Sequence, residues 1–196
     1  MERKELIKKI RQFFSIEELV CPHVYRKWGQ RSWQFLDTAF LETLYIIRKY
    51  ILAAPMYCNV GDYTQRGLRC NKCKLVANKS VSYLSAHVLG KAGDFSVEGM
   101  SAEEARQKII ENIDKLPHPI RMENGVAWLH IDVLEQYGID EKIHLFNQYS
   151  NETNTHIQPH PPAGHILCRL PELPQCSSQL HTSERLRNHQ GNNHLP

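Results

Sequence analysis

The dipeptide Asn124-Gly125 stands between two apolar segments and gives the strongest local signal in this sequence. Asn-Gly favours the backbone angles of a two-residue turn that joins antiparallel strands. We therefore expect residues 120–123 and 126–133 to form a β-hairpin. Polar and apolar residues alternate in the second segment, which places His130 and Asp132 on one face of its strand.

Both helices and further strands are expected around this hairpin. Asp37 is suited to cap a helix, and two Ser-x-x-Glu sequences, beginning at Ser15 and Ser101, are typical of capping boxes at helix starts. Apolar residues recur at helical spacing after Met1 and after Asp37. The expected helices cover residues 1–14, 37–52 and 101–116, and the expected strands and short elements cover 55–60, 92–97 and 140–144.

The composition changes after about Tyr149. Residues 150–196 are rich in Pro, Asn, His, Gln and Ser and have few periodic apolar residues, so we expect a mostly disordered tail. The predicted organisation is an N-terminal helix over 1–14, one domain over 15–149 and this tail. With 41% hydrophobic residues, a domain of this length can bury a core without disulfide bonds.

Charge and hydropathy exclude some classes of protein. A formal net charge of +3 is too small to indicate nucleic acid as the partner. No apolar run reaches the roughly 20 residues of a transmembrane helix, and the N-terminus lacks the pattern of a secretory signal. We therefore expect synthesis in the cytoplasm, and no feature specifies an oligomeric state.

The chain has six cysteines, which are Cys21, Cys58, Cys70, Cys73, Cys168 and Cys176. Their scattered spacing and the missing signal favour reduced thiols over disulfides. Cys70-Asn-Lys-Cys73 is a single C-x-x-C, and no second C-x-x-C or H-x-x-H follows it. Ordinary thiols are therefore the expected state of these two residues, and a structural zinc site is the alternative.

The segment 85–95 contains the first candidate metal ligands. His87 and Asp94 lie seven residues apart, and a turn through small residues such as Gly90 would bring both side chains into one cavity. His130, on the polar face of the hairpin strand, is the third candidate. Zinc binds His nitrogen and Asp oxygen at about 2 Å, and its catalytic sites combine three protein ligands with one water.

The pattern S-x-H-x-x-G-x-A-x-D, followed by W-x-H, resembles the M15 family of zinc peptidases, which includes D-Ala-D-Ala carboxypeptidases and peptidase-type endolysins of bacteriophages. The matching residues are Ser85, His87, Gly90, Ala92, Asp94 and His130. The resemblance covers about residues 15–137. It implies an α+β fold with a small antiparallel sheet and flanking helices, shared with the hedgehog signalling domain, and Zn²⁺ as the cofactor.

The resemblance also implies a general base. Many members carry an acidic residue three positions before the last histidine, where this chain has Ala127. Glu123 is the candidate instead, and Asp132 is the alternative. A two-residue turn would pair Glu123 with Val126, which lies about 13 Å along the strand from His130, so that a wider loop is needed to bring Glu123 to the metal.

Gly67-Leu-Arg69 looks like a G-Y-R segment of the family, whose arginine binds substrate. Arg69, Arg66 and Arg121 are the candidates for binding a substrate carboxylate. Ser85 is a candidate for a hydrogen bond near the metal or the substrate, or else it forms the turn.

The expected function is a zinc metallopeptidase that hydrolyses peptide bonds in peptidoglycan stem peptides, as a carboxypeptidase or a phage endolysin that reaches the cell wall after release or delivery. The alternative is a non-catalytic zinc-binding module of the same fold, with a structural or virion-associated role.

Overall fold

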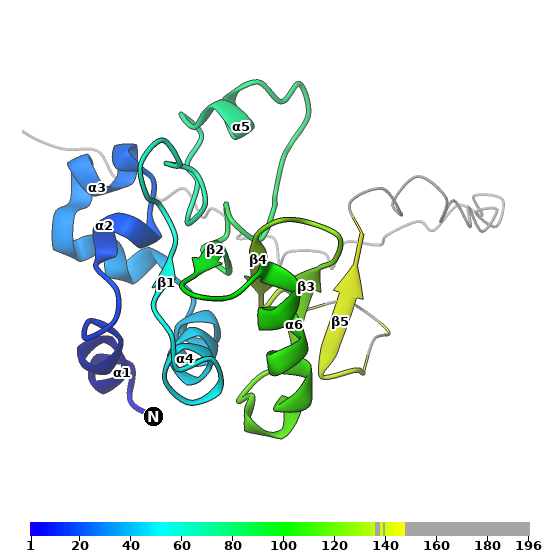
Figure 1. Ribbon diagram of the computed structural model, residues 1–196. Helices are drawn as coiled ribbons and strands as arrows, with labels where there is room; N and C mark the ends of the chain where they lie inside the picture. The colour runs from blue at the N-terminus through cyan, green and yellow to red at the C-terminus, as the bar shows by residue number, and fades with distance from the viewer. Residues whose placement is uncertain (136–137, 139, 148–196) are drawn as a thin grey trace, which may run out of the picture. The chain divides into compact units, whose positions relative to one another are not determined.

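The computed structural model describes residues 1–135, 138 and 140–147, all within the first of two units into which the chain divides, Met1–Thr155. The expected tail, 150–196, lies outside the described residues. The helical elements are α1 (Arg3–Ile10), α2 (Ile16–Leu19), α3 (Pro22–Trp28), η1 (Gly29–Phe35), α4 (Thr38–Ile46), η2 (Ile47–Ile51), α5 (Lys74–Ala77), α6 (Ala102–Glu111) and η3 (Ile113–Lys115). The strands are β1 (Met56–Tyr57), β2 (Ala92–Val97), β3 (Ile120–Glu123), β4 (Leu129–Asp132) and β5 (Ile143–Phe146). The architecture is α+β, as expected (Figure 1).

The three predicted helix caps are confirmed. Ser15 and Ser101 each accept a hydrogen bond from the backbone N–H three residues later, and the glutamate at that position accepts one in return. Asp37 Oδ1 accepts hydrogen bonds from the N–H groups of Ala39 and Phe40, at 2.8 and 3.2 Å. These local interactions begin α2, α6 and α4.

In the described part, five strands form one sheet in the order β1-β2-β4-β3-β5. The first three neighbouring pairs are antiparallel, whereas β5 is parallel to β3. The sheet is therefore mixed, whereas the sequence analysis predicted a purely antiparallel sheet. The reason is topological: β5 follows β4 in the chain and reverses direction, but it lies beyond β3 at the edge of the sheet.

The register between β3 and β4 corrects the predicted two-residue turn. Arg121 lies opposite Asp132, and the same register continued by two residues places Glu123 opposite His130. Residues 124–128 form a wide loop instead of extending the strand. This wider loop is what the sequence analysis required for Glu123 to come near the predicted metal ligands.

A buried arginine from α6 accounts for the wide loop. The Arg106 guanidinium donates hydrogen bonds to the backbone carbonyls of Glu123, Val126 and Trp128, at 3.1–3.2 Å. Its charge is paired with Glu103, at 2.8 Å. Because these three carbonyls are satisfied by one buried side chain, the loop is stable where a tight Asn-Gly turn would otherwise form.

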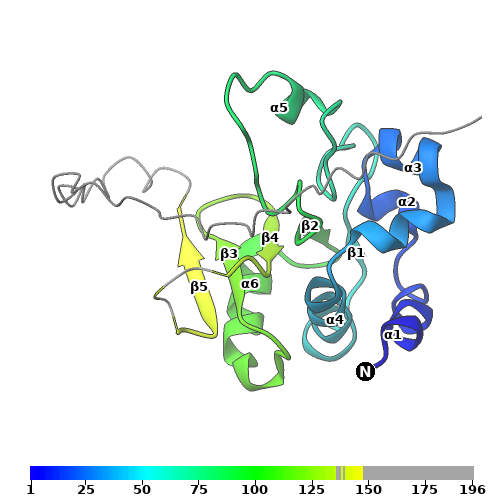
Figure 2. The same cartoon turned by 180° about the vertical axis from the view of Figure 1, so that it is seen from behind.

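The helices form two groups around the sheet. Figures 1 and 2 show α1–α4 grouped at the β1 side of the sheet, and α6 packs against β4 and β2. Leu6 and Ile10 of α1 are fully buried in the same hydrophobic core as Phe95 and Ile131 of the sheet. Within the described residues, no helix has the length and hydrophobicity needed to cross a membrane.

Candidate metal centre

The structure brings the three predicted metal ligands together. Asp94 on β2 lies directly opposite His130 on β4 in the antiparallel register. His87 lies in the turn before β2, and all three side chains are buried. One ligand atom from each residue lies within 4.8 Å of the other two. The sequence prediction of a shared cavity is therefore confirmed in its geometry.

The turn that presents His87 requires glycine at position 90. Gly90 has a φ of +70°, and a Cβ there would lie 2.0 Å from the carbonyl oxygen of Phe35. The turn is closed by a 2.8 Å hydrogen bond from the Lys91 N–H to the Ala86 carbonyl. Only a residue without a side chain fits this conformation and this contact.

Hydrogen bonds orient the two imidazoles toward Asp94. His87 Nδ1 lies 3.0 Å from the Gly67 carbonyl oxygen, which leaves His87 Nε2 3.4 Å from Asp94 Oδ1. His130 Nδ1 lies 2.7 Å from Asp94 Oδ1, and its Nε2 lies 2.9 Å from Asp132 Oδ2. Ligands at about 2.0–2.1 Å from a tetrahedral zinc are separated by about 3.3 Å. The His87–Asp94 distance already matches this separation, whereas the His130–Asp94 distance would have to grow by about 0.6 Å to admit the ion.

Neighbouring polar groups orient each of the three candidate ligands. A carbonyl on His87 Nδ1 and a carboxylate on His130 Nε2 favour the tautomers whose other nitrogen has a free lone pair. Arg69 Nη2 donates to Asp94 Oδ2 at 3.1 Å. The Arg121 guanidinium holds Asp132 in two hydrogen bonds, of 2.8 and 2.9 Å. Each ligand thus has its own oriented partner.

Contacts within the site lower the pKa of Asp94 and raise the pKa of His130. Burial raises the pKa of the Asp94 carboxyl, but hydrogen bonds and charge from His130 and His87 outweigh it and hold that pKa well below its ordinary value. Burial lowers the pKa of His130, but Asp132 and Asp94 outweigh it and raise the pKa to about 9. A metal ion at this position must therefore displace a proton from His130.

The ligands line a cavity of about 350 Å³. Its lining residues are Arg69, Tyr83, Leu84, Ser85, Ala86, His87, Asp94, Arg121, Glu123, Trp128, His130, Asp132, Leu134 and Phe146. Glu123 is buried there, and no described residue offers a hydrogen-bond partner to its Oε1. A buried carboxylate oxygen without a partner is costly, and a functional role is one explanation for such a group.

Asp132, the alternative base, is already engaged. Its side chain is fully buried, and its two oxygens accept hydrogen bonds from Arg121, from the Leu134 N–H and from His130. Burial raises the pKa of Asp132, but His130 and Arg121 outweigh it and lower that pKa. Both oxygens of Asp132 are therefore engaged, whereas Oε1 of Glu123 has no partner among the described residues.

The predicted substrate-binding residues divide into two groups. Arg69, Arg121 and Ser85 line the cavity, and Ser85 Oγ also accepts a 3.4 Å hydrogen bond from the Val88 N–H in the turn. Arg66 does not line it: its guanidinium stacks on Tyr63, 3.8 Å from the ring centre, and donates to Ser96. The two interpretations of Ser85 are thus compatible.

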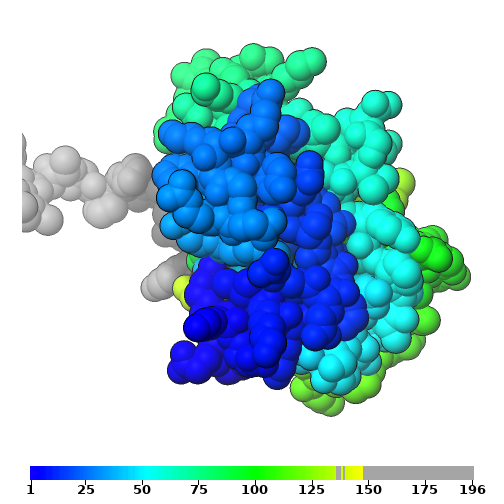
Figure 3. Space-filling model, turned by 90° about the vertical axis from the view of Figure 1, so that its left-hand side faces the viewer, coloured from blue at the N-terminus to red at the C-terminus, as the bar shows by residue number. Residues whose placement is uncertain are grey.

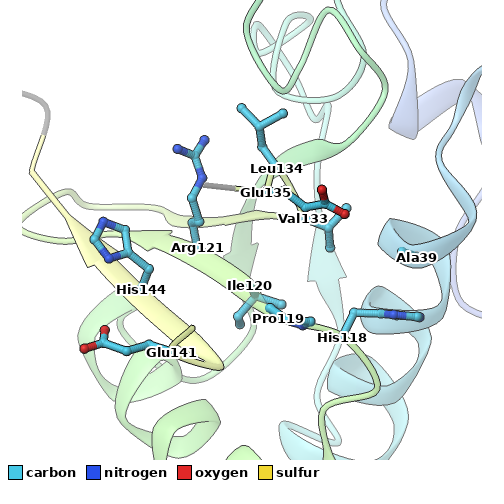
Figure 4. A pocket seen from close by; sticks show the side chains of 10 residues that line it. All are labelled: Ala39, His118, Pro119, Ile120, Arg121, Val133, Leu134, Glu135, Glu141 and His144. Carbon is cyan, nitrogen blue, oxygen red and sulfur yellow. The ribbon is translucent and has the colours of Figure 1, made fainter. Parts of the chain in front are cut away.

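A neighbouring cavity of about 280 Å³ shares Arg121 with this one. Figure 4 shows that its side chains come from β3, β5, α4 and the segments between strands, with His118 and His144 among them. His118 is paired with Glu42, at 2.9 Å. Neither histidine belongs to a metal-capable group within the described residues.

Sequence reasoning missed several residues of the site. Tyr83 and Leu84 reach the cavity from an irregular segment without periodicity, and Phe146 comes from β5, which begins later than expected. Arg106 supports Glu123 from a helix whose sequence carries no sign of that contact.

Comparison of the chain with protein-family models, curated proteins and solved structures found no match in any of the three.

Proposed function

We propose that this protein is a zinc metallopeptidase that hydrolyses peptide bonds in peptidoglycan stem peptides. The donor set of two imidazoles and one carboxylate suits zinc in a catalytic site. When bound, zinc would lower the pKa of a water ligand toward about 7 and polarise the substrate carbonyl. The orienting contacts of His87 and His130 are those that a catalytic metal site uses.

The single observation that supports an enzyme most is the buried Glu123 carboxylate in the cavity of the three candidate ligands, whose Oε1 has no hydrogen-bond partner among the described residues. The β3–β4 register pairs Arg121 with Asp132, and its continuation by two residues, with Glu123 opposite His130, supports a role for Glu123 as the base. In this proposal Glu123 accepts the proton of the attacking water and passes it to the leaving amine. A purely structural zinc site has no use for such a group.

The substrate class rests on the motif resemblance and on the arginines of the cavity. Arg69 uses Nε for the Gln65 carbonyl and Nη2 for Asp94. A guanidinium has five N–H donors, so donors remain for a substrate carboxylate. Stem peptides carry such carboxylates, and the aromatic side chains of Tyr83 and Trp128 offer apolar walls for the peptide.

The test is digestion of purified peptidoglycan by the wild-type chain, with release of free amino groups as the readout. We expect activity that a chelator removes and that added zinc restores. Glu123→Gln should be inactive while keeping its zinc. Glu17→Gln, which changes an exposed glutamate in α2, is the matched control and should retain full activity.

The second candidate is a non-catalytic zinc module of the same fold, and Ala127, at the position where many M15 peptidases carry an acid, favours it. That module would bind zinc as tightly but would release no amino groups from any peptidoglycan. In both proposals the fold is of the hedgehog and D-Ala-D-Ala-peptidase type. In the first, the chain is made in the cytoplasm and acts on the cell wall after release.

A further inference from the structure

A second cluster of potential metal ligands lies apart from the first. It consists of Cys21, His23, Cys70 and Cys73, whose ligand atoms all lie within 4.8 Å of one another. Cys21 immediately precedes α3, His23 lies in its first turn, and Cys73 immediately precedes α5. Among the described residues, these and the first site are the two groups able to hold a metal.

Backbone contacts bring the two segments of the cluster together. The Cys21 N–H donates to the Leu68 carbonyl at 2.8 Å, and the Leu68 N–H donates to the Leu19 carbonyl at 2.9 Å. Gly67 permits this approach, because a Cβ there would lie 2.2 Å from the Leu19 carbonyl oxygen. Figure 3, viewed from the side of the N-terminal helices, shows residues of α3 and of the segment before α5 on the same face.

The distances within the cluster suit a tetrahedral sulfur and nitrogen site. Cys73 Sγ lies 3.9 Å from His23 Nδ1, and zinc bonds of about 2.3 Å to sulfur and 2.0–2.1 Å to nitrogen separate such ligands by about 3.6 Å. The Lys72 N–H points at Cys70 Sγ and the Cys70 N–H at Cys73 Sγ, both at 3.4 Å. Backbone N–H donors of this kind stabilise thiolates, which are the form that binds metal.

We propose that Cys21, His23, Cys70 and Cys73 bind a second zinc ion in a closed, structural site. Four protein ligands leave no open position, which is the mark of a structural site. Three thiolates and one divalent ion give a net charge of −1. Arg26, Lys27 and Lys72 line an adjacent cavity of about 470 Å³ and would offset that charge.

This inference replaces the expectation of ordinary thiols. The other half of the site does not follow Cys70-Asn-Lys-Cys73 but precedes it by 47 residues, as Cys21-Pro-His23. Pro22 is also the first residue of α3, so the start of this helix fixes the positions of Cys21 and His23.

The second ion would hold the segment that orients the first site. Two residues that orient the first site lie within three positions before Cys70. The Gly67 carbonyl contacts His87, and the Arg69 guanidinium contacts Asp94. The proposal stands on the Cys and His geometry alone and does not require that the protein be a peptidase.

Cobalt substitution distinguishes the two sites, because only a thiolate site gives sulfur-to-cobalt charge-transfer absorption in the near ultraviolet. The full chain, reduced and with Cys168 and Cys176 replaced by Ser, is loaded with Co²⁺. We expect two ions per chain and the charge-transfer band. Cys73→Ser should remove the band and one ion, whereas Cys58→Ala, at a buried cysteine outside the cluster, should change neither.

His130→Ala should remove one ion and leave the band intact. A chain that binds no metal at the first site and a chain that binds none at the cysteine cluster therefore give different results. If Cys73→Ser does not fold, His23→Ala replaces it, with an altered band as the expected result. Absence of the band in the reduced parent chain, or its persistence at full intensity in both cluster variants, would overturn the proposal.

Discussion

Replacing Glu123 by Gln separates catalysis from metal binding at this site. The Glu123 side chain is 6% exposed, and its Oε1 has no partner among the described residues. Glutamine keeps the volume but cannot accept the proton of the attacking water. Loss of a general base lowers kcat by about 10²–10⁴-fold, which corresponds to about 3–5 kcal/mol of transition-state stabilisation.

The same change should not destabilise the fold. A buried polar group without a partner costs about 1–3 kcal/mol, and an uncharged amide is easier to bury than a carboxylate. We therefore expect the free energy of unfolding to be unchanged or higher. A gain of about 1 kcal/mol raises the Tm of a domain of this size by about 2–4 °C.

Three measurements on one preparation check this reasoning: kcat on purified peptidoglycan, zinc per chain by elemental mass spectrometry, and Tm by calorimetry. The expected pattern is lost activity, unchanged zinc and an unchanged or raised Tm. Glu17→Gln should match the wild type in all three. Activity within twofold of wild type, or loss of zinc, would refute the assignment of Glu123 as the base.

Three further predictions concern the groups around the ligands. Asp132→Asn leaves the Arg121 charge without its buried partner and should lower the unfolding free energy by about 3 kcal/mol in denaturant titration, in contrast to Glu123→Gln. In the metal-free chain, the stabilising charge on His130 is fully present below its ordinary pKa of 6.5 and is lost as the pH rises through about 9. Zinc competes with that proton, so its affinity in calorimetric titration should rise about tenfold per pH unit across this window. Gly90→Ala should cost at least about 2 kcal/mol by calorimetry, because its Cβ would meet the Phe35 carbonyl.

Local sequence signals predicted the parts of the fold that depend on neighbours in the chain. The caps at Ser15, Asp37 and Ser101 formed as expected, because the interacting groups lie within three residues of one another. The first ligand pair was also predictable. Gly90 creates the turn for His87, and Asp94 follows on the next strand.

The features that escaped prediction depend on contacts between distant segments. Asn124-Gly125 favours a two-residue turn, but a wider loop forms because Arg106, on another element, donates hydrogen bonds to three carbonyls there. Likewise, Cys70 and Cys73 lie close to Cys21 and His23, which are far upstream in the chain, and the bridge between Val20 and Leu68 helps to bring the two segments together. Neither contact leaves a periodic or short-range pattern in the sequence.

The proposed function depends on a metal centre formed by His87, Asp94 and His130. The most direct test is the zinc content of the purified full chain, compared between the wild type and His130→Ala by elemental mass spectrometry. We predict that the variant contains one zinc per chain fewer than the wild type while retaining the metal of the cysteine cluster. Equal zinc content in the two proteins after reconstitution would contradict the claim, and the hydrolase proposal would fall with it.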